Sequence, residues 1–264
     1  MLYTAEHTIK VNGSDLSYIA FGTGDKALVI IPGLGYDYIR GKGHLFAMMC
    51  RIFTGRYRVF IFDKKEDIPE GTTAEDLADD VAAAMMQIGI KKADVIGVSL
   101  GGMIAQYLTL NYPHMVHKLV LSVTLSRPND TMKSVISEWT DLAEKGDMTA
   151  VAIKSMEKIY SKAYMEKYAL MIPVMLSMTK YTSPERFIRL AKAGLTCDTY
   201  DRLDEIGCPV FVIGGRQDNV TTCEAAEDIA RKLRCGMYIY EDLGHSVFDE
   251  ARDYNDRIFE FFVS

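Results

Sequence analysis

Short apolar runs that alternate with helical segments are the feature that most constrains how this chain can fold. Residues 27–33 (ALVIIPG) and 57–63 (YRVFIFD) are rich in β-branched or aromatic residues, and each ends in a turn or a polar group. Such runs are typical of strands that are buried on both faces of a parallel sheet. Residues 118–125 (KLVLSVTL) and 208–215 (CPVFVIGG) repeat the pattern. We therefore expect an α/β fold whose sheet is covered by helices on both faces.

The segments between these runs carry helical signals. Residues 72–90 begin with Thr73 and Asp76 at capping-box spacing, and apolar side chains such as Leu77 and Val81 recur on one helical face. At the start of the chain, Asn12-Gly13 predicts a hairpin turn. With that hairpin the expected strands number eight, and the sheet is mostly parallel: residues 7–11, 16–21, 27–33, 57–63, 93–98, 118–125, 208–215 and 237–242.

The alternation stops between residues 129 and 200, where the chain reads as helical and offers no buried strand. We interpret residues 129–200 as a helical insertion between two parts of one core, residues 1–128 and 201–264. Beyond it we expect a capped helix at 222–233 and one last helix from Val247 to about Phe262.

Charge and cysteine content exclude several function classes. The net charge of -6 gives no basic face for a nucleic acid. The five cysteines are scattered and lack CxxC pairs, so they favour reduced thiols in the cytoplasm, and no His–Cys cluster suggests a metal. We expect no signal peptide and no membrane span, because no apolar stretch approaches about 20 residues.

The candidate nucleophile is Ser99, in GVSLG at residues 97–101. This stretch matches G-x-S-x-G with a strand before it and a helix after it, the context that the motif requires. Glycines on either side leave room for a sharp turn that exposes the serine hydroxyl at the carboxyl end of the sheet, beside a helix N-terminus. The alternative is a tight corner with no chemical role.

A serine nucleophile needs a base, and His245 is the best placed histidine. It follows the expected strand at 237–242 and precedes the last helix. The other four fit less well, on the first strand, near a helix start or around a surface turn: His7, His44, His114 and His117.

The base in turn needs an orienting acid, and Asp218 follows the strand at 208–215 directly. Its structural alternative is an Asx-type turn cap. Asp63 also follows a strand but precedes the serine in sequence, while Glu241 and Asp242 lie close to His245. The order serine, acid, histidine is the one expected for this elbow, and it favours Asp218.

Together these residues resemble the α/β-hydrolase superfamily, over essentially the whole chain. The elbow, the insertion after the sixth strand, the acid after the seventh and the histidine after the eighth all correspond. Segments such as GGMIAQYLTLNYP resemble single-domain cytosolic members, including enol-lactonases, carbon–carbon bond hydrolases, small esterases and proline iminopeptidases. Ser99 disfavours the branches that use an aspartate nucleophile.

The resemblance implies an oxyanion hole made by the backbone N–H groups of Leu34, in PGLG, and Leu100. Two departures stand out. Pro32 occupies a position that is often histidine, and KKEDIPEG follows Asp63 where relatives often have R-G-x-G-x-S.

The resemblance also implies that the insertion is a cap over the substrate pocket. Methionine adapts to irregular apolar shapes, so the cap methionines as a group are candidates to line a plastic cleft, whereas for any single one the cap's own core is the preferred reading. They are Met132, Met148, Met156, Met165, Met171, Met175 and Met178, accompanied by Tyr160, Tyr164, Tyr168 and Tyr181.

The expected function is hydrolysis of a small carboxylic ester, lactone or related acyl compound through an acyl-enzyme, with no metal or organic cofactor. The alternatives are a carbon–carbon bond hydrolase or an aminopeptidase with the same triad, or a hydrolase-like ligand receptor with little turnover. The expected partner is a small-molecule acyl substrate.

Overall fold

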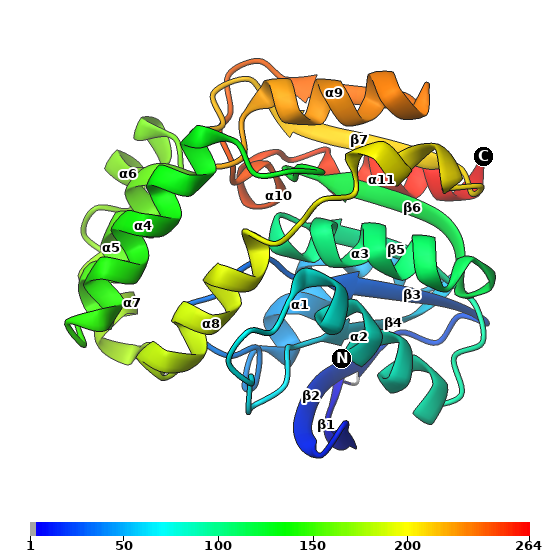
Figure 1. The fold of residues 1–264 in the computed structure, drawn as a ribbon, viewed down its shortest axis with the longest axis horizontal. Helices are drawn as coiled ribbons and strands as arrows, with labels where there is room; N and C mark the ends of the chain where they lie inside the picture. Colours follow the sequence, from blue (N-terminus) through cyan, green and yellow to red (C-terminus); the bar gives the residue numbers. More distant parts are fainter. Residues whose placement is uncertain (1–3) are drawn as a thin grey trace.

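The computed structural model describes residues 4–264, and its eight strands form one sheet in the order β1-β2-β4-β3-β5-β6-β7-β8 (Figure 1). β2 pairs antiparallel with β1 and β4, and all later pairs are parallel. The strands are β1 Thr4–Val11, β2 Ser14–Phe21, β3 Lys26–Ile31, β4 Tyr57–Phe62, β5 Ala93–Val98, β6 Val116–Ser122, β7 Val210–Gly215 and β8 Gly236–Tyr240. The predicted fold class is confirmed.

The opening hairpin turns at the predicted residues. Asn12 and Gly13 have φ of 46° and 84°, the two positive values that a tight two-residue hairpin turn requires. Its strands pair from Val11 with Ser14 to Thr4 with Phe21.

Helices cover both faces of the sheet because alternate strand residues are buried on opposite sides. Val29 and Val95 belong to the core under α2 (Ala74–Gln87), α3 (Leu100–Asn111) and α9 (Cys223–Leu233). Residues Leu28 and Ile96 belong to the core of the other face, with side chains of α1 and α11. Those two helices span Gly43–Met49 and Tyr254–Val263.

The last helix differs from the prediction. The stretch expected as one helix forms α10 (Val247–Glu250) and α11, separated at Ala251, whose backbone is extended. Two carboxylates of α10 bind the insertion, Asp249 to Tyr160 and Glu250 to Ser161, whereas α11 packs on the sheet. A single straight helix could not reach both partners.

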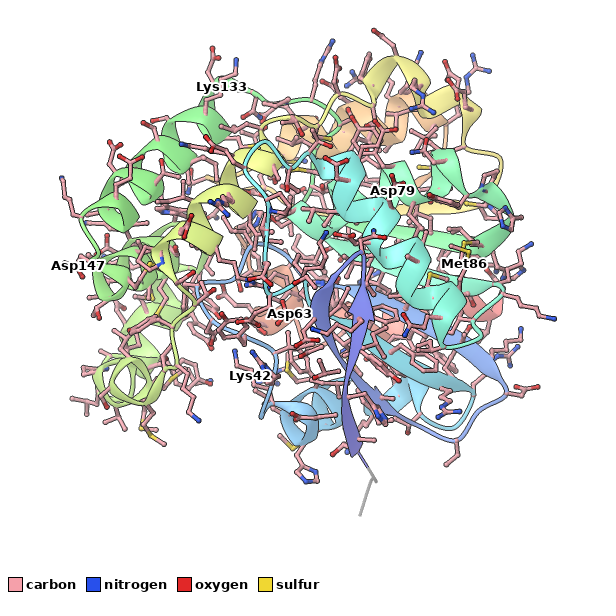
Figure 2. All side chains as sticks on the ribbon, turned by 60° about the horizontal axis from the view of Figure 1, so that its bottom comes forward. Lys42, Asp63, Asp79, Met86, Lys133 and Asp147 are labelled. Carbon is pink, nitrogen blue, oxygen red and sulfur yellow. The ribbon has the colours of Figure 1, made fainter. Side chains whose placement is uncertain are left out.

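Five helices lie between β6 and β7, and Figure 1 shows them together beside one end of the sheet. They are α4 Asp130–Glu144, α5 Met148–Ile159, α6 Lys162–Tyr168, α7 Ile172–Met178 and α8 Pro184–Gly194. Side-chain N-caps begin four of them: Asn129, Asp147, Ser161 and Ser183. In Figure 2, Lys133 and Asp147 lie on the outer surface of this bundle.

Short 3₁₀ turns complete the chain at Arg51–Phe53, Pro113–Met115 and Tyr200–Glu205. Within residues 4–264, none of the helices combines the length and the apolar character needed to cross a membrane.

Candidate active site

Ser99 lies in the turn between β5 and α3 with a strained backbone, φ 54° and ψ -120°. The neighbouring glycines make this turn possible. A Cβ atom on Gly97 would come within 2.6 Å of the Gly101 carbonyl oxygen, and one on Gly101 would lie 1.8 Å from the Ile31 carbonyl oxygen. The motif therefore has a steric origin in this fold.

Hydrogen bonds fix the Ser99 backbone and leave its side chain free. Its N–H donates to the Ser122 carbonyl at 2.9 Å, and its carbonyl accepts the Thr124 hydroxyl at 2.7 Å. Among residues 4–264 the Ser99 hydroxyl has no hydrogen-bond partner of its own. It is available to a ligand.

Asp218 and His245 meet through a hydrogen bond of 2.9 Å between Asp218 Oδ2 and His245 Nδ1, and both side chains are buried. Asp218 Oδ1 also accepts the N–H groups of Val220 and Thr221, and Oδ2 accepts the Thr221 hydroxyl. The two readings of Asp218 thus coexist: one oxygen caps a turn while the other holds the histidine.

The pKa of Asp218 is set by opposing effects. Burial alone would raise it, but the adjacent His245 and the donors Val220 and Thr221 hold the pKa of this carboxyl below its usual value. Asp218 is therefore an anion in the neutral range and accepts hydrogen bonds through both oxygens.

A cavity of about 200 Å³ contains both Ser99 and His245. Its walls come from the loop after β3, the loop after β4, and the helical insertion. Five insertion side chains besides Arg186 line it: Trp139, Ser155, Ile159, Phe187 and Leu190. A second, narrower cavity shares Leu34, Ser99 and Trp139 with the first. The structure therefore brings Ser99, His245 and, behind it, Asp218 together.

The competing acids are engaged elsewhere. Asp63 accepts hydrogen bonds from the Ile39 and Lys64 amides and pairs with Arg186, and Glu241 pairs with Arg216.

A second Asp–His pair joins Asp94 to His117 at 2.7 Å. Asp94 lies near the amino-terminal end of β5, whereas Ser99 follows its carboxyl end. This pair is therefore at the opposite end of the strand from Ser99.

The two backbone donors predicted beside the serine are both free. Within residues 4–264 neither the Leu34 amide nor the Leu100 amide donates a hydrogen bond to the protein. Both residues line the narrower cavity with Ser99, and a Cβ on Gly33 would lie 3.1 Å from the Ser99 Cβ. Two unpaired N–H groups beside a serine can receive a developing negative charge.

Lys64 supports the loop after β3 that carries Leu34. Its buried ammonium donates to the carbonyls of Pro32 and Gly33, the latter at 2.7 Å. Burial lowers the pKa of Lys64 to about 8, with Asp63 opposing that shift and Arg186 adding to it. Lys64 lies in the segment where the chain departs from R-G-x-G-x-S.

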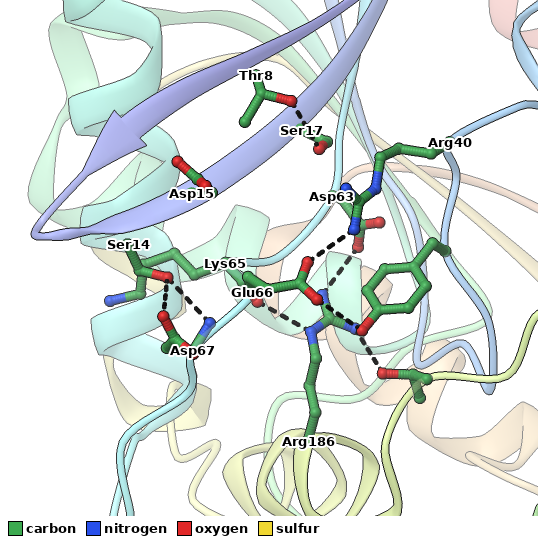
Figure 3. Close-up of polar contacts among 12 residues, drawn as sticks. Thr8, Ser14, Asp15, Ser17, Arg40, Asp63, Lys65, Glu66, Asp67 and Arg186 are labelled. Carbon is green, nitrogen blue, oxygen red and sulfur yellow. Dashed lines mark hydrogen bonds and ion pairs between the residues drawn. The ribbon is translucent and has the colours of Figure 1, made fainter.

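Arg186 connects the insertion to the loop after β4. From α8 its guanidinium reaches Asp63 at 3.2 Å and the Lys65 carbonyl at 2.9 Å (Figure 3). It also donates to the Lys64 carbonyl at 2.8 Å. Figure 2 shows Asp63 between the sheet and the insertion, with Lys42, another residue of the cavity wall, nearby. Sequence reasoning missed Lys64, Arg186 and Trp139, because nothing in the local pattern marks their partners.

The predicted methionine lining is wrong for the main cavity. None of its lining residues is a methionine, and Met132 alone among those named lines the narrower one. Met148 and Met156 are buried in the insertion, while Met171, Met175 and Met178 are more than half exposed.

Comparisons with known proteins agree with the observed fold. A family model described as the alpha/beta hydrolase fold matches residues 26–150. Over 251 residues the chain is 22% identical to 3-oxoadipate enol-lactonase 2 of Acinetobacter baylyi, covering 92% of this chain and 86% of that protein. It is 25% identical over 242 residues to pyrrolizixenacetamide deacetylase of Xenorhabdus hominickii, covering 90% of each.

Among solved structures, the enol-lactonase from Burkholderia xenovorans LB400 superposes with a TM-score of 0.86 at 20% identity, over 98% of this chain and 100% of that one. The chain has the α/β-hydrolase fold. Within residues 4–264, no group of three or more His, Cys, Asp or Glu side chains is arranged to hold a metal ion.

Proposed function

We propose that this protein is an α/β-hydrolase, a serine hydrolase that cleaves a small carboxylic ester, lactone or related acyl compound through an acyl-enzyme. One observation carries the proposal: the Asp218–His245 hydrogen bond of 2.9 Å lies behind a cavity that contains both His245 and the strained, unpartnered Ser99. This arrangement offers a nucleophile, an orienting acid and a base in the chain order that the serine elbow uses.

In this mechanism Ser99 Oγ attacks the substrate carbonyl carbon while His245 takes the serine proton. Asp218 accepts a hydrogen bond from His245 Nδ1, which leaves Nε2 as the nitrogen that takes the proton. The oxyanion receives hydrogen bonds from the Leu34 and Leu100 amides. His245 then protonates the leaving alcohol as the ester bond breaks, and a water repeats the sequence to release the acid and free Ser99.

Lys64 has a positioning role in this proposal. A trans peptide unit places its carbonyl and its N–H on opposite sides. Because Lys64 holds the Gly33 carbonyl, the N–H of the same unit, which belongs to Leu34, is directed away from Lys64. The insertion, residues 129–200, acts as a cap that supplies the upper wall of the cavity.

A fluorophosphonate probe tests the nucleophile. We expect the folded protein to be labelled on Ser99, and Ser99→Ala to abolish labelling. Ser155→Ala is the matched control, because Ser155 lines the same cavity and the variant should still be labelled. Label on another residue, or none on folded protein, would overturn the proposal.

Pre-steady-state hydrolysis of 4-nitrophenyl butyrate tests the acyl-enzyme. A burst of nitrophenolate stoichiometric with enzyme is expected if deacylation is slower than acylation. A parallel assay with a β-diketone separates ester hydrolysis from carbon–carbon bond cleavage. Faster turnover of the diketone would move the activity to the carbon–carbon class.

A further inference from the structure

At the end of β6, three consecutive residues connect the turn of the nucleophile to the loop that carries the acid. The Ser122 carbonyl accepts the Ser99 N–H at 2.9 Å, and the Thr124 hydroxyl donates to the Ser99 carbonyl at 2.7 Å. Between them, the Val123 carbonyl accepts the hydroxyl of Thr221 at 3.0 Å. Because Thr221 belongs to the acid loop, one short segment contacts both the nucleophile turn and that loop.

Thr221 also contacts the carboxylate of Asp218 directly. Its hydroxyl oxygen lies 2.8 Å from Oδ2, the oxygen that binds His245, so its one proton is shared between Oδ2 and the Val123 carbonyl. Its backbone N–H donates to Oδ1 at 3.0 Å, beside the Val220 N–H at 2.8 Å. With His245 Nδ1 the carboxylate thus has two donors on each oxygen, which fills its acceptor positions. Thr221 supplies two of these four donors.

The backbone on both sides of this contact is strained. Val123 has φ of 44° and Thr222 has φ of 72°, although both residues are β-branched and such residues rarely adopt positive values. Strained conformations of this kind persist only where the surrounding contacts hold them, and they gather at functional sites. The strain here lies at the residue whose carbonyl accepts the Thr221 hydroxyl and at the residue that follows Thr221 in sequence.

The start of the insertion holds the same loop from a third direction. Asn129, the N-cap of α4, donates from Nδ2 to the Thr221 carbonyl at 2.8 Å, while its Oδ1 accepts the Met132 N–H at 2.8 Å. Thr221 is thereby fixed at its carbonyl by the insertion and at its hydroxyl by the end of β6. A change in the direction of its side chain would move the carboxylate of the acid with it.

We propose that Thr221 is a positioning residue for the reaction: its hydroxyl sets the direction of the Asp218 carboxylate and links that carboxylate, through the Val123 carbonyl, to the nucleophile turn. Thr221 acts through Asp218 on the imidazole of His245. Without the hydroxyl the carboxylate is free to rotate, and the imidazole loses its fixed orientation toward the serine. This inference rests on the proposed function, because it assigns a role within the same triad.

Two substitutions of Thr221 test the role of the hydroxyl. Thr221→Val keeps the branched shape and should lower kcat on 4-nitrophenyl butyrate by about tenfold or more, with KM within about twofold, because the lost hydrogen bond serves a charged group that acts in the transition state. Thr221→Ser keeps the hydroxyl and should stay within about threefold of wild-type kcat. Wild-type kcat in Thr221→Val would overturn the inference, and so would an equal loss in Thr221→Ser.

Thr109→Val is the matched control for the loss of a buried hydroxyl. Thr109 is 2% exposed, and its hydroxyl donates to the Ala105 carbonyl at 2.7 Å within α3. This variant should keep the kcat of wild type, and circular dichroism and urea unfolding should show that it and Thr221→Val are folded. A loss of kcat as large as that of Thr221→Val would mean general destabilisation and would contradict the positioning role.

Proton NMR supplies a readout that does not need turnover. The proton on His245 Nδ1, buried in its hydrogen bond to Asp218, should give a far-downfield resonance whose position reports that bond. We expect this resonance to move or broaden in Thr221→Val and to stay in place in Thr221→Ser. An unchanged resonance in Thr221→Val would overturn the inference while the proposed function stands. A resonance that responds to Thr221→Val in a protein that hydrolyses no ester would sink the proposed function and keep the positioning of the pair.

Discussion

One buried lysine, Lys64, supports the loop after β3. The Lys64 ammonium donates to the carbonyls of Pro32 and Gly33. A charged donor on the carbonyl polarises the whole peptide unit and strengthens its N–H as a donor. The charge state of Lys64 should therefore affect how well Leu34 stabilises an oxyanion.

The kcat–pH profile tests this role. Below a pH of about 8 Lys64 carries its charge, and above it the charge is lost, so kcat of wild type should fall several-fold on an alkaline limb near pH 8. Lys64→Arg keeps the charge at higher pH and should remove that limb. Lys64→Met should have a lower kcat and no limb there. A limb near pH 8 that persists in both variants would assign it to another group.

The acid at the site gives a second prediction. Asp218→Asn should lower kcat by about 10⁴-fold with little change in KM, because the amide holds the imidazole in the wrong tautomer. Asp63→Asn is the matched control, since Asp63 also follows a strand and lines the cavity but binds Arg186 instead of a histidine. Circular dichroism should confirm that both variants fold. A larger loss of kcat in Asp63→Asn would contradict the assignment.

At this scale the sequence could indicate Ser99, Asp218 and His245, because each follows a recognisable strand in the expected order. Arg186 could not be found this way. Its partner Asp63 is 123 positions away, and a lone arginine on a helix usually faces solvent. Trp139 could not be found either, because the cavity that it lines is enclosed by segments far apart in the sequence.

The turn between β5 and α3 can form only because Gly97 and Gly101 have no side chains. Gly101→Ala should lower the free energy of unfolding by more than about 3 kcal/mol, because the new Cβ would overlap the Ile31 carbonyl oxygen. Gly55→Ala is the control: an added Cβ there meets no atom within 4 Å, and the change should stay within about 0.5 kcal/mol. Urea unfolding measures both, and equal midpoints would contradict the steric account.

Element types were predictable where apolar spacing and turn residues agreed, as in the hairpin at Asn12-Gly13 and the box that caps α2. The break between α10 and α11 was not, because it depends on the contacts of Asp249 and Glu250 with the insertion. The expectation that the cap methionines line the cleft was wrong for a related reason. Helical spacing shows which residues share a face, but not whether that face meets a cavity, the insertion's own core or solvent.

Across the whole molecule, a few polar contacts connect the insertion to the core. Arg186 binds Asp63 and the backbone after β4, the Thr182 amide donates to the Tyr36 carbonyl, and the Ser246 amide donates to the Ile159 carbonyl. The last of these contacts lies next to His245 in sequence. The position of the insertion is thus coupled to the geometry of the site.

The ion pair between these two parts can be measured by a double-mutant cycle. Arg186→Met should cost about 3–5 kcal/mol of unfolding free energy, because it leaves the Asp63 carboxylate buried without its partner. Adding Asp63→Asn should restore part of that loss, since the uncompensated charge is gone. Denaturant unfolding of the two single variants and the double variant gives the coupling. Strict additivity would mean that the pair contributes nothing across this junction.

The anchorage of Arg186 also limits how far this chain can be recombined with its relatives. Residues 129–200 look like an exchangeable cassette, yet Arg186 at their far end is matched to the Asp63-Lys64-Lys65 backbone of the core. A chimera that grafts a foreign cassette without this arginine onto this core would leave the Asp63 carboxylate buried without its ion-pair partner. A core without the aspartate would leave the Arg186 guanidinium buried in the same way. Residues 129–200 should therefore be transferred together with the loop after β4 if a hybrid is to fold.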